Sequence, residues 1–377
     1  MLAGNASAGP WNFEPRIGVS TTYDTNPGLR EVDPVSETHV AALFNLPLRY
    51  DADAVEFSLT PNGSISNSSG YSSLASNSLH LDANAQFLND LGSTVLQGSL
   101  ARDSSLYHAG GYANGVGVRR DTGELAGDWN RYLTERSQIE LDLSWSRVRY
   151  DQPPNATILV DYRYFSAGPA FVYALSELNT LKVIGSFGDY QSLDGITGSK
   201  SGNAQLALVR QLSELWSLTA SAGYSHSVNS EKFYFGPYLL GTVTFDQNGA
   251  VYALNVSRQS EKLTLSGGVS RALTPTGFAY LSRQDSVNLN ATYIRSERWD
   301  FSLSGVWQHL RNPTVTVVNS GVHYLNARLT ANWHWTPQWI ISMHVARITQ
   351  EYGPPPVNAA SSGVGLDFTR QFLRTEL

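Results

Sequence analysis

Hydrophobic and polar residues alternate one by one along many segments of the chain. Between Leu79 and Phe87 the odd positions are apolar and the even positions are polar. The same pattern runs through 139–145, 216–224, 299–307 and 325–335. Strict alternation gives a β-strand one apolar face and one polar face. The helical i, i+3, i+4 spacing of apolar residues is not sustained in any segment, so the pattern predicts an all-β chain.

Two kinds of connection separate the alternating segments. The short ones are 51–53, 89–92, 134–136, 176–179, 213–215, 260–261, 296–297 and 336–337. The long ones are rich in Gly, Pro, Asn and Ser, and include 25–37, 66–77, 104–120, 229–249, 275–284 and 311–321. Short turns on one side and long loops on the other are typical of transmembrane barrels. Placing Asn248-Gly249 inside a long loop, rather than in a hairpin turn, keeps the two kinds in alternation.

We therefore predict an all-β fold: a transmembrane antiparallel up-and-down β-barrel of about 18 strands, with 16 as the alternative count. The barrel is expected over residues 12–372, with an N-terminal periplasmic lead at 1–11 and a C-terminal tail at 373–377. Periodicity alone also leaves open a soluble β-sandwich or propeller. Such a fold would need a second sheet to bury the outward aromatic and leucine side chains, so the regular connections favour the barrel.

Aromatic residues gather near both ends of the predicted strands. An aromatic girdle is expected from Phe87, Trp216, Trp299, Trp307, Trp335 and Trp339, with further members Tyr23, Tyr150, Tyr173, Tyr190 and Tyr224. Two such girdles mark the membrane interfaces of transmembrane barrels. The last strand is apolar on one parity up to Phe372, with Arg370 as an interruption. It resembles the C-terminal strand by which the outer-membrane assembly machinery recognises bacterial barrels.

Composition narrows the class of protein further. Of the 377 residues, 15% are charged and 11% are aromatic, the formal net charge is -6, and there is no Cys. The aromatic content argues against disorder, and the absence of Cys excludes disulfide scaffolds and thiolate metal sites. The few lysines do not support binding to nucleic acid. No apolar signal-peptide core follows Met1, so we expect either a soluble protein or an outer-membrane barrel written without its signal.

The polar parity of the predicted strands is expected to face the lumen. An acidic wall is predicted from Glu56, Asp82, Glu124, Asp128, Glu140 and Asp142. The facing strands contribute a lining that includes Asn255, Ser257, Asn288, Asn290, Asn326, Arg328 and Asn332. A wall of like charge can set ion selectivity, and weak hydrogen-bonding groups suit hydroxyl-rich molecules. The alternative is that these side chains are ordinary polar filler, with the acids paired to inward Arg16, Arg163 or Arg328.

Catalytic and metal-binding patterns are weak. There is no His-Glu-x-x-His pair, no Walker loop and no Gly-x-Ser-x-Gly elbow, so we expect no enzyme, no cofactor and no metal. His226 and His344 lie near serines, but a barrel-embedded hydrolase is the less favoured interpretation. A calcium site in the first long loop, from Asp24 and its acidic neighbours, is likewise less favoured.

Two short segments carry a family resemblance. Thr22-Tyr23-Asp24-Thr25-Asn26-Pro27 closes the first strand, and Ser270-Arg271-Ala272-Leu273-Thr274-Pro275-Thr276-Gly277 ends an upward strand. Both resemble the outer-membrane β-barrel porin 2 family. The resemblance implies a Gram-negative outer-membrane porin that gives exopolysaccharide its passage across the outer membrane, beside a periplasmic polysaccharide-export protein. A general diffusion or oligosaccharide uptake porin, and a plugged surface-interaction barrel, are the alternatives. Lipid and lipopolysaccharide are the expected membrane partners.

Overall fold

A single antiparallel sheet accounts for nearly all of the described residues. In the computed structural model these are 11–66, 77–104, 118–151, 159–311, 321–352, 357–372 and 375–376. The strand segments are β1 (Trp11–Phe13), β2 (Arg16–Asp24), β3 (Glu37–Asn45), β4 (Leu48–Ala52), β5 (Val55–Ser66), β6 (Ser78–Asn89), β7 (Gly92–Ser104), β8 (Arg119–Tyr132), β9 (Ser137–Asp151), β10 (Tyr162–Ser176), β11 (Asn179–Ser192), β12 (Thr197–Gln211), β13 (Trp216–Phe235), β14 (Tyr238–Gln259), β15 (Leu263–Pro275), β16 (Leu281–Ser296), β17 (Trp299–Arg311), β18 (Gly321–Thr336), β19 (Trp339–Tyr352), β20 (Val357–Gln371) and β21 (Thr375–Glu376). Among these residues there is no helix with the length and apolarity needed to span a bilayer.

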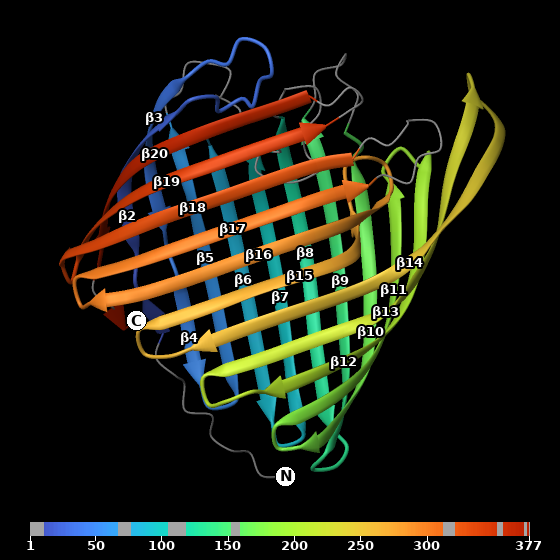
Figure 1. The fold of residues 1–377 in the computed structure, drawn as a ribbon, viewed down its shortest axis with the longest axis horizontal. Helices are drawn as coiled ribbons and strands as arrows, with labels where there is room; N and C mark the ends of the chain where they lie inside the picture. Colours follow the sequence, from blue (N-terminus) through green and yellow to red (C-terminus); the bar gives the residue numbers. More distant parts are fainter. Residues whose placement is uncertain are drawn as a thin grey trace.

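The sheet closes on itself because its first and last strands pair. Ser20 of β2 lies opposite Asp367 of β20, in a ladder that runs the length of β2. From β5 to β20 each segment pairs with the next in sequence, and the strands tilt around a common axis (Figure 1). Closure leaves no free edge around the wall. The prediction of an antiparallel up-and-down barrel is therefore confirmed, and the soluble sandwich or propeller is excluded.

Three of the strands are interrupted, which reconciles 21 segments with the predicted count. β1 and β2 form one strand with a break at Glu14-Pro15. β1 pairs with β4 and β2 pairs with β3, and the register is the same on both sides of the break. β3 and β4 likewise keep one register on β5, with a break at Leu46-Pro47. Proline has no N–H to donate to a ladder, so a break beside it is expected. β21 continues β20 after a one-residue shift, and the barrel therefore has 18 strands in its described residues.

The predicted barrel limits, 12–372, are too narrow at both ends. Trp11 already belongs to β1. Thr375 and Glu376, which lie within the predicted tail, pair with Phe13 and Asn12. The last residues follow the wall because the short β1 segment offers them an open ladder. The tail is thus part of the sheet as far as it is described.

One connection on the long-loop side is a two-stranded ribbon. β13 and β14 contain 20 and 22 residues and project well beyond the rim (Figure 1). The expected loop at 229–249 is wrong, since Asn248 lies opposite His226 in the middle of this ladder. The chain reverses at Gly236, whose φ of 58° is a conformation that glycine adopts without strain. The turn still lies on the long-loop side, so the alternation of sides holds.

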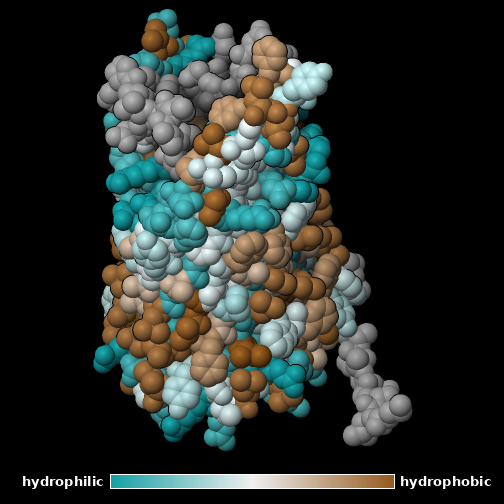
Figure 2. Space-filling view, turned by 90° about the vertical axis from the view of Figure 1, so that its right-hand side faces the viewer, coloured by the Kyte–Doolittle hydropathy of each residue, from teal (hydrophilic) through white to brown (hydrophobic). Residues whose placement is uncertain are grey.

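An apolar band surrounds the outer wall. Its members include the exposed side chains Leu96, Leu100, Leu125, Leu143, Leu206, Leu254, Leu289, Leu303, Leu329 and Leu366. Figure 2 shows one side of this band as a hydrophobic zone with a hydrophilic zone above it, toward the long loops. A broad outward apolar surface on a closed barrel is stable only against lipid. The fold is therefore that of a transmembrane barrel.

Aromatic side chains lie at the edges of the apolar band, several with an arginine beside them. The outward parity includes Phe87, Trp216, Trp299, Trp307, Trp335 and Trp339. The Arg258 guanidinium lies 5.7 Å from the Trp216 ring centroid, and that of Arg370 lies 5.4 Å from Trp339. These cation–π contacts explain how Arg370 is accommodated on the apolar parity.

Two predicted girdle members, Tyr150 and Tyr190, point the other way. Tyr190 is fully buried inside the barrel, in a cluster with Val148, Tyr162 and Leu281, and Tyr150 packs against that cluster. The expectation for these two tyrosines is wrong because it used only their closeness to a strand end. Their even-numbered positions share the inward parity of Val148 and Tyr162.

Candidate channel lumen

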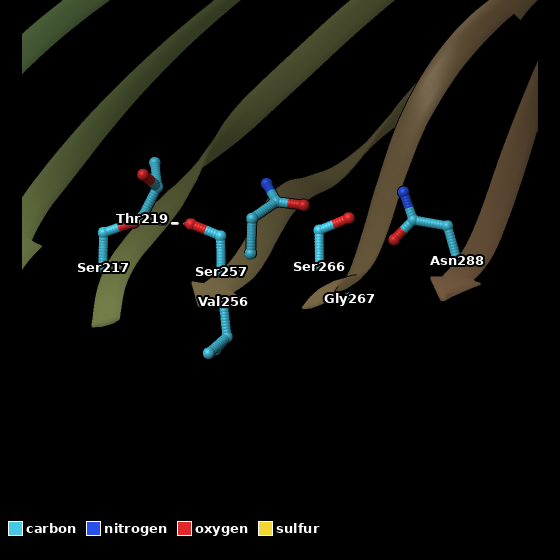
Figure 3. Close-up of a pocket in the computed structure, with 8 residues that line it drawn as sticks. Ser217, Thr219, Val256, Ser257, Ser266, Gly267 and Asn288 are labelled. Carbon is cyan, nitrogen blue, oxygen red and sulfur yellow. Dashed lines mark hydrogen bonds between the residues drawn. The ribbon is translucent and has the colours of Figure 1, made fainter. Parts of the chain in front are cut away.

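The polar parity of the strands faces the inside of the barrel. Figure 3 shows Ser217, Ser257, Ser266 and Asn288 projecting to one side of the sheet, where they border a hollow, while Val256 projects to the other side. On β8 the same rule holds, since Glu124 borders an inner hollow and its neighbour Leu125 is 60% exposed on the outer surface. Each strand therefore contributes every second side chain to the lumen.

The structure brings the acids of the predicted wall onto neighbouring strands. Asp128 of β8 lies directly opposite Asp142 of β9, and both border one inner hollow. Asp82 and Glu124 border the adjacent hollow, on either side of Ser99. Like charges in direct opposition destabilise a strand pair. Their presence here means that the wall concentrates negative charge at a cost to the sheet.

Glu56 and Glu140 extend this wall at its two edges. Glu56 of β5 lies opposite Asp51 of β4, a lumen acid that the sequence analysis did not single out. Glu140 accepts hydrogen bonds from the Lys182 ammonium at 3.0 and 3.1 Å. The acidic wall therefore runs from β4 to β9. Arg49 shares the inward parity of Asp51 at the β4 end, and Lys182 of β11 pairs with Glu140 at the other end.

The predicted cationic partners are partly wrong. Arg163 lies opposite Arg147 and Gln191, on the outward parity, and cannot pair with a lumen acid. Arg16 and Arg328 are on the inward parity. Arg16 is on β2, two strands from Glu56 of β5, and Arg328 is on β18, beyond the closure of the barrel. Lys182 was missed, although the outward Val183 beside it indicated its inward direction.

A second group of charged side chains lies where the barrel closes. Ser20 donates a hydrogen bond of 2.5 Å to the Asp367 carboxylate, and His344 Nδ1 lies 3.5 Å from the other oxygen of Asp367. The hydroxyl and the imidazole thus both contact the carboxylate, which is not the order that activates a serine. His226 is on the outer surface and contacts Asn248. Neither histidine forms the hydrolase arrangement considered from the sequence.

Asn26 of the first long loop is held by hydrogen bonds to the loop itself and to β20. Asn26 donates to the Arg30 and Ala360 carbonyls and accepts from the Arg30 N–H at 2.9 Å. Within the described part of the chain no group of three His, Cys, Asp or Glu residues is arranged to hold a metal ion. The calcium site considered from the sequence therefore has no support in the geometry of this loop.

The remaining lumen wall is uncharged over most of its width. Asn255 and Asn288 flank Gly268, whose missing side chain leaves room for both amides. The other lining residues predicted from the sequence also have the inward parity: Ser257, Asn290, Asn326, Arg328 and Asn332. Hydroxyl groups pair across neighbouring strands at Ser217–Ser257, 2.6 Å, and Ser270–Ser286, 2.8 Å. Hydroxyls and amides can exchange partners with a passing solute, so this wall offers weak, renewable contacts.

The connection between β15 and β16 enters the lumen instead of standing above it. We call residues 276–280 the inward loop. Tyr190 of β11 donates a hydrogen bond to the Thr276 carbonyl at 3.1 Å, and the Val160 N–H donates to Gly277 at 2.7 Å. β11 and β15 are separated along the wall by three strands. The loop therefore spans a sector of the lumen near its long-loop end.

Tyr280 fixes the far end of the inward loop. It is 3% exposed, its ring packs 5.5 Å from that of Phe245, and its hydroxyl donates to Glu231 at 2.7 Å. Burial, followed by the hydrogen bond to Glu231, raises the pKa of Tyr280 above its ordinary value, which keeps the phenol protonated as the donor. Ala279 has a φ of 75°, a conformation that is unfavourable for alanine and must be held by the surrounding contacts. These contacts therefore hold the inward loop in a defined position inside the lumen.

Comparison with known proteins gives similarity only at the level of solved structures. No protein-family model and no curated protein matches the chain. OpdO of Pseudomonas aeruginosa is similar with a TM-score of 0.47 and 12% identity, covering 96% of this chain and 97% of that one. OpdK of the same organism, solved with vanillate, gives 0.46 and 11%, covering 96% and 99%. The siderophore receptor PiuA of Acinetobacter baumannii gives 0.45 and 8%, covering 97% and 82%.

The barrel itself defines the class of protein. A closed antiparallel wall with an even number of strands, an apolar outer band between aromatic edges and a polar interior is the architecture of outer-membrane barrels. Every one of these features is present in the described residues. The chain is an outer-membrane β-barrel with a polar lumen.

Proposed function

We propose that the barrel is a non-enzymatic channel that passes hydrated, hydroxyl-rich molecules across the outer membrane, with exported polysaccharide as its cargo. The observation that carries the proposal is the division of the lumen into two walls. One wall, from β4 to β9, presents carboxylates, and the other, centred on β13 to β18, presents amides and hydroxyls. Weak hydrogen-bonding groups allow a glycan to enter and to leave.

The charge of the lumen restricts the cargo. The acids of the wall outnumber the cations that face them, and Lys182 neutralises only Glu140. A polyanionic glycan would be repelled by the carboxylates of this wall that have no cation beside them. The proposal is therefore specific to neutral or weakly cationic polysaccharide. The short-turn mouth is the side at which a periplasmic export protein would deliver such a polymer.

A liposome-swelling assay tests this charge preference. Neutral oligosaccharides are expected to enter liposomes that contain the barrel faster than uronic-acid oligosaccharides of the same length. Liposomes without protein provide the baseline. Equal rates for the two glycans, or faster entry of the acidic one, would contradict the proposal.

A general porin for small cations is the second candidate, favoured by the directly opposed Asp128 and Asp142. Opposed carboxylates attract a counterion more strongly than a single one. This candidate predicts cation-selective current that neutral oligosaccharides do not block. The glycan channel predicts both the selectivity and the block.

The inward loop is expected to narrow the channel. Replacing residues 276–280 by a short Gly-Ser connection should raise the single-channel conductance, because the segment spans part of the lumen and is held there by Tyr190 and Glu231. The measurement is the conductance histogram in planar bilayers. Trimming the ribbon tip, residues 233–240, is the control, since it lies beyond the rim and should leave conductance unchanged. Identical histograms for the wild type and the inward-loop variant would show that another part of the lumen sets the conductance.

A further inference from the structure

Arginine side chains gather on the outer wall where the apolar band ends. The arginine cluster consists of Arg102, Arg119, Arg147, Arg149 and Arg163, all on the outward parity of β7 to β10. Asp121 and Asp151 lie among them on the same parity. The surface therefore carries an excess of positive charge, in contrast to the acidic lumen on the other face of the same strands.

Arg147 and Arg163 form the centre of the arginine cluster. They lie directly opposite each other across β9 and β10, and both are exposed. Like charges in this arrangement destabilise a strand pair unless an anion lies between them. The Arg163 guanidinium donates to the Gln191 side-chain carbonyl, a neutral partner, and the Gln191 amide lies 3.5 Å from the Asp189 carboxylate. Arg102, by contrast, forms a bidentate ion pair with Asp121 at 2.7 and 2.9 Å.

The position of this pair indicates where its anion comes from. Two residues along the same strands, Trp145 and Phe165 lie opposite each other and are exposed on the outer surface. Aromatic side chains at the edge of an apolar band mark the level of the lipid headgroups. Arg147 and Arg163 lie on the long-loop side of that edge, where the phosphates of the facing leaflet are found.

We propose that Arg147 and Arg163 bind a phosphate group of the phosphorylated glycolipid, of the lipid A type, in the outer leaflet. Each guanidinium can donate two parallel hydrogen bonds to phosphate oxygens, which makes a facing pair of arginines a strong phosphate site. Arg119 and Arg149 contribute long-range attraction. The site lies outside the lumen, so it does not depend on the cargo of the channel.

Binding of purified lipid A to the full barrel in detergent tests the proposal. The probes are the diphosphorylated lipid and the same lipid after enzymatic dephosphorylation. The wild-type barrel is expected to prefer the diphosphorylated form. The double variant Arg147→Gln/Arg163→Gln should bind that form about tenfold more weakly, since each lost contact is a charge-assisted hydrogen bond.

A matched variant at the other rim tests whether binding needs Arg147 and Arg163 or only some pair of outward arginines. Arg210→Gln/Arg258→Gln removes two outward arginines beside Trp216, on the short-turn side, and should leave lipid A binding unchanged. Unchanged single-channel conductance shows that each variant is folded. Wild-type affinity in the Arg147/Arg163 variant, or equal binding of the dephosphorylated lipid, would overturn the proposal. Competition by inorganic phosphate as effective as that by the lipid would overturn the assignment to the membrane.

Discussion

Neutralising four acids of the lumen is expected to lower the preference of the channel for cations by about fivefold or more. The variant is Glu56→Gln/Asp82→Asn/Glu140→Gln/Asp142→Asn. Two unit charges 4 Å apart interact by about 1 kcal/mol even in water, which is a factor of about five in local ion concentration. The four positions lie on a wall shared by neighbouring strands, so their fields add along one path. The measurement is the reversal potential under a salt gradient.

Lys182 provides the matched control for this experiment. It faces the lumen and bonds to Glu140 at 3.0 Å. Lys182→Gln removes a lumen cation and should shift the reversal potential in the opposite direction, toward stronger cation preference. If the four-acid variant and Lys182→Gln both leave the reversal potential where it was, the acidic wall does not line the conducting path.

An arginine on the lipid face of β8 is expected to destabilise the barrel. Leu125 is 60% exposed and lies near the middle of the strand, opposite Gly98 and Trp145. Leu125→Arg would place a cation inside the apolar band, one strand from the aromatic edge at Trp145. The cost there lies between about 0–1 kcal/mol, the value near the interface, and about 2–4 kcal/mol, the value at the bilayer midplane. The measurement is the free energy of unfolding in lipid vesicles, obtained by denaturant titration.

The neighbouring residue is the control because it has the opposite parity. Ala126 borders two inner hollows, so the Ala126→Arg side chain would remain in water and should cost little. A large loss of stability for Ala126→Arg with none for Leu125→Arg would mean that the two faces of β8 are exchanged. The pair of variants therefore tests the register of the whole acidic wall.

Much of the fold follows from the sequence because the membrane imposes a simple rule. Every lipid-facing position must be apolar, and strands expose every second side chain, so the alternation at 79–87 or 299–307 predicts both the strand and its outer face. The same rule predicts the number of strands, 18, and the side of the barrel on which the short turns lie. The predicted directions of Arg163, Tyr150 and Tyr190 are wrong because they did not use the alternation of inward and outward positions. Each was assigned by residue type or by position along the strand, and each lies on the face that its parity indicates.

The parts that the sequence did not predict depend on contacts outside the membrane or across the lumen. The ribbon at 229–249 is paired in water, where no lipid enforces alternation, so its sequence pattern predicts a loop. The inward loop is positioned by Tyr190 and Glu231, which are far from it in the chain. No local pattern records such contacts. The direction of Lys182 could have been inferred, because the alternation of β11 extends through it.

Single-channel recording from the refolded barrel in planar bilayers tests the central claim most directly. The claim is that the polar lumen is a continuous path whose amide and hydroxyl wall accepts glycans and whose carboxylate wall repels anionic ones. The expected result is stable, cation-preferring steps that a neutral oligosaccharide blocks and a uronic-acid oligosaccharide of equal length does not. Insertion without conductance, or steps that respond to neither glycan, would contradict the account.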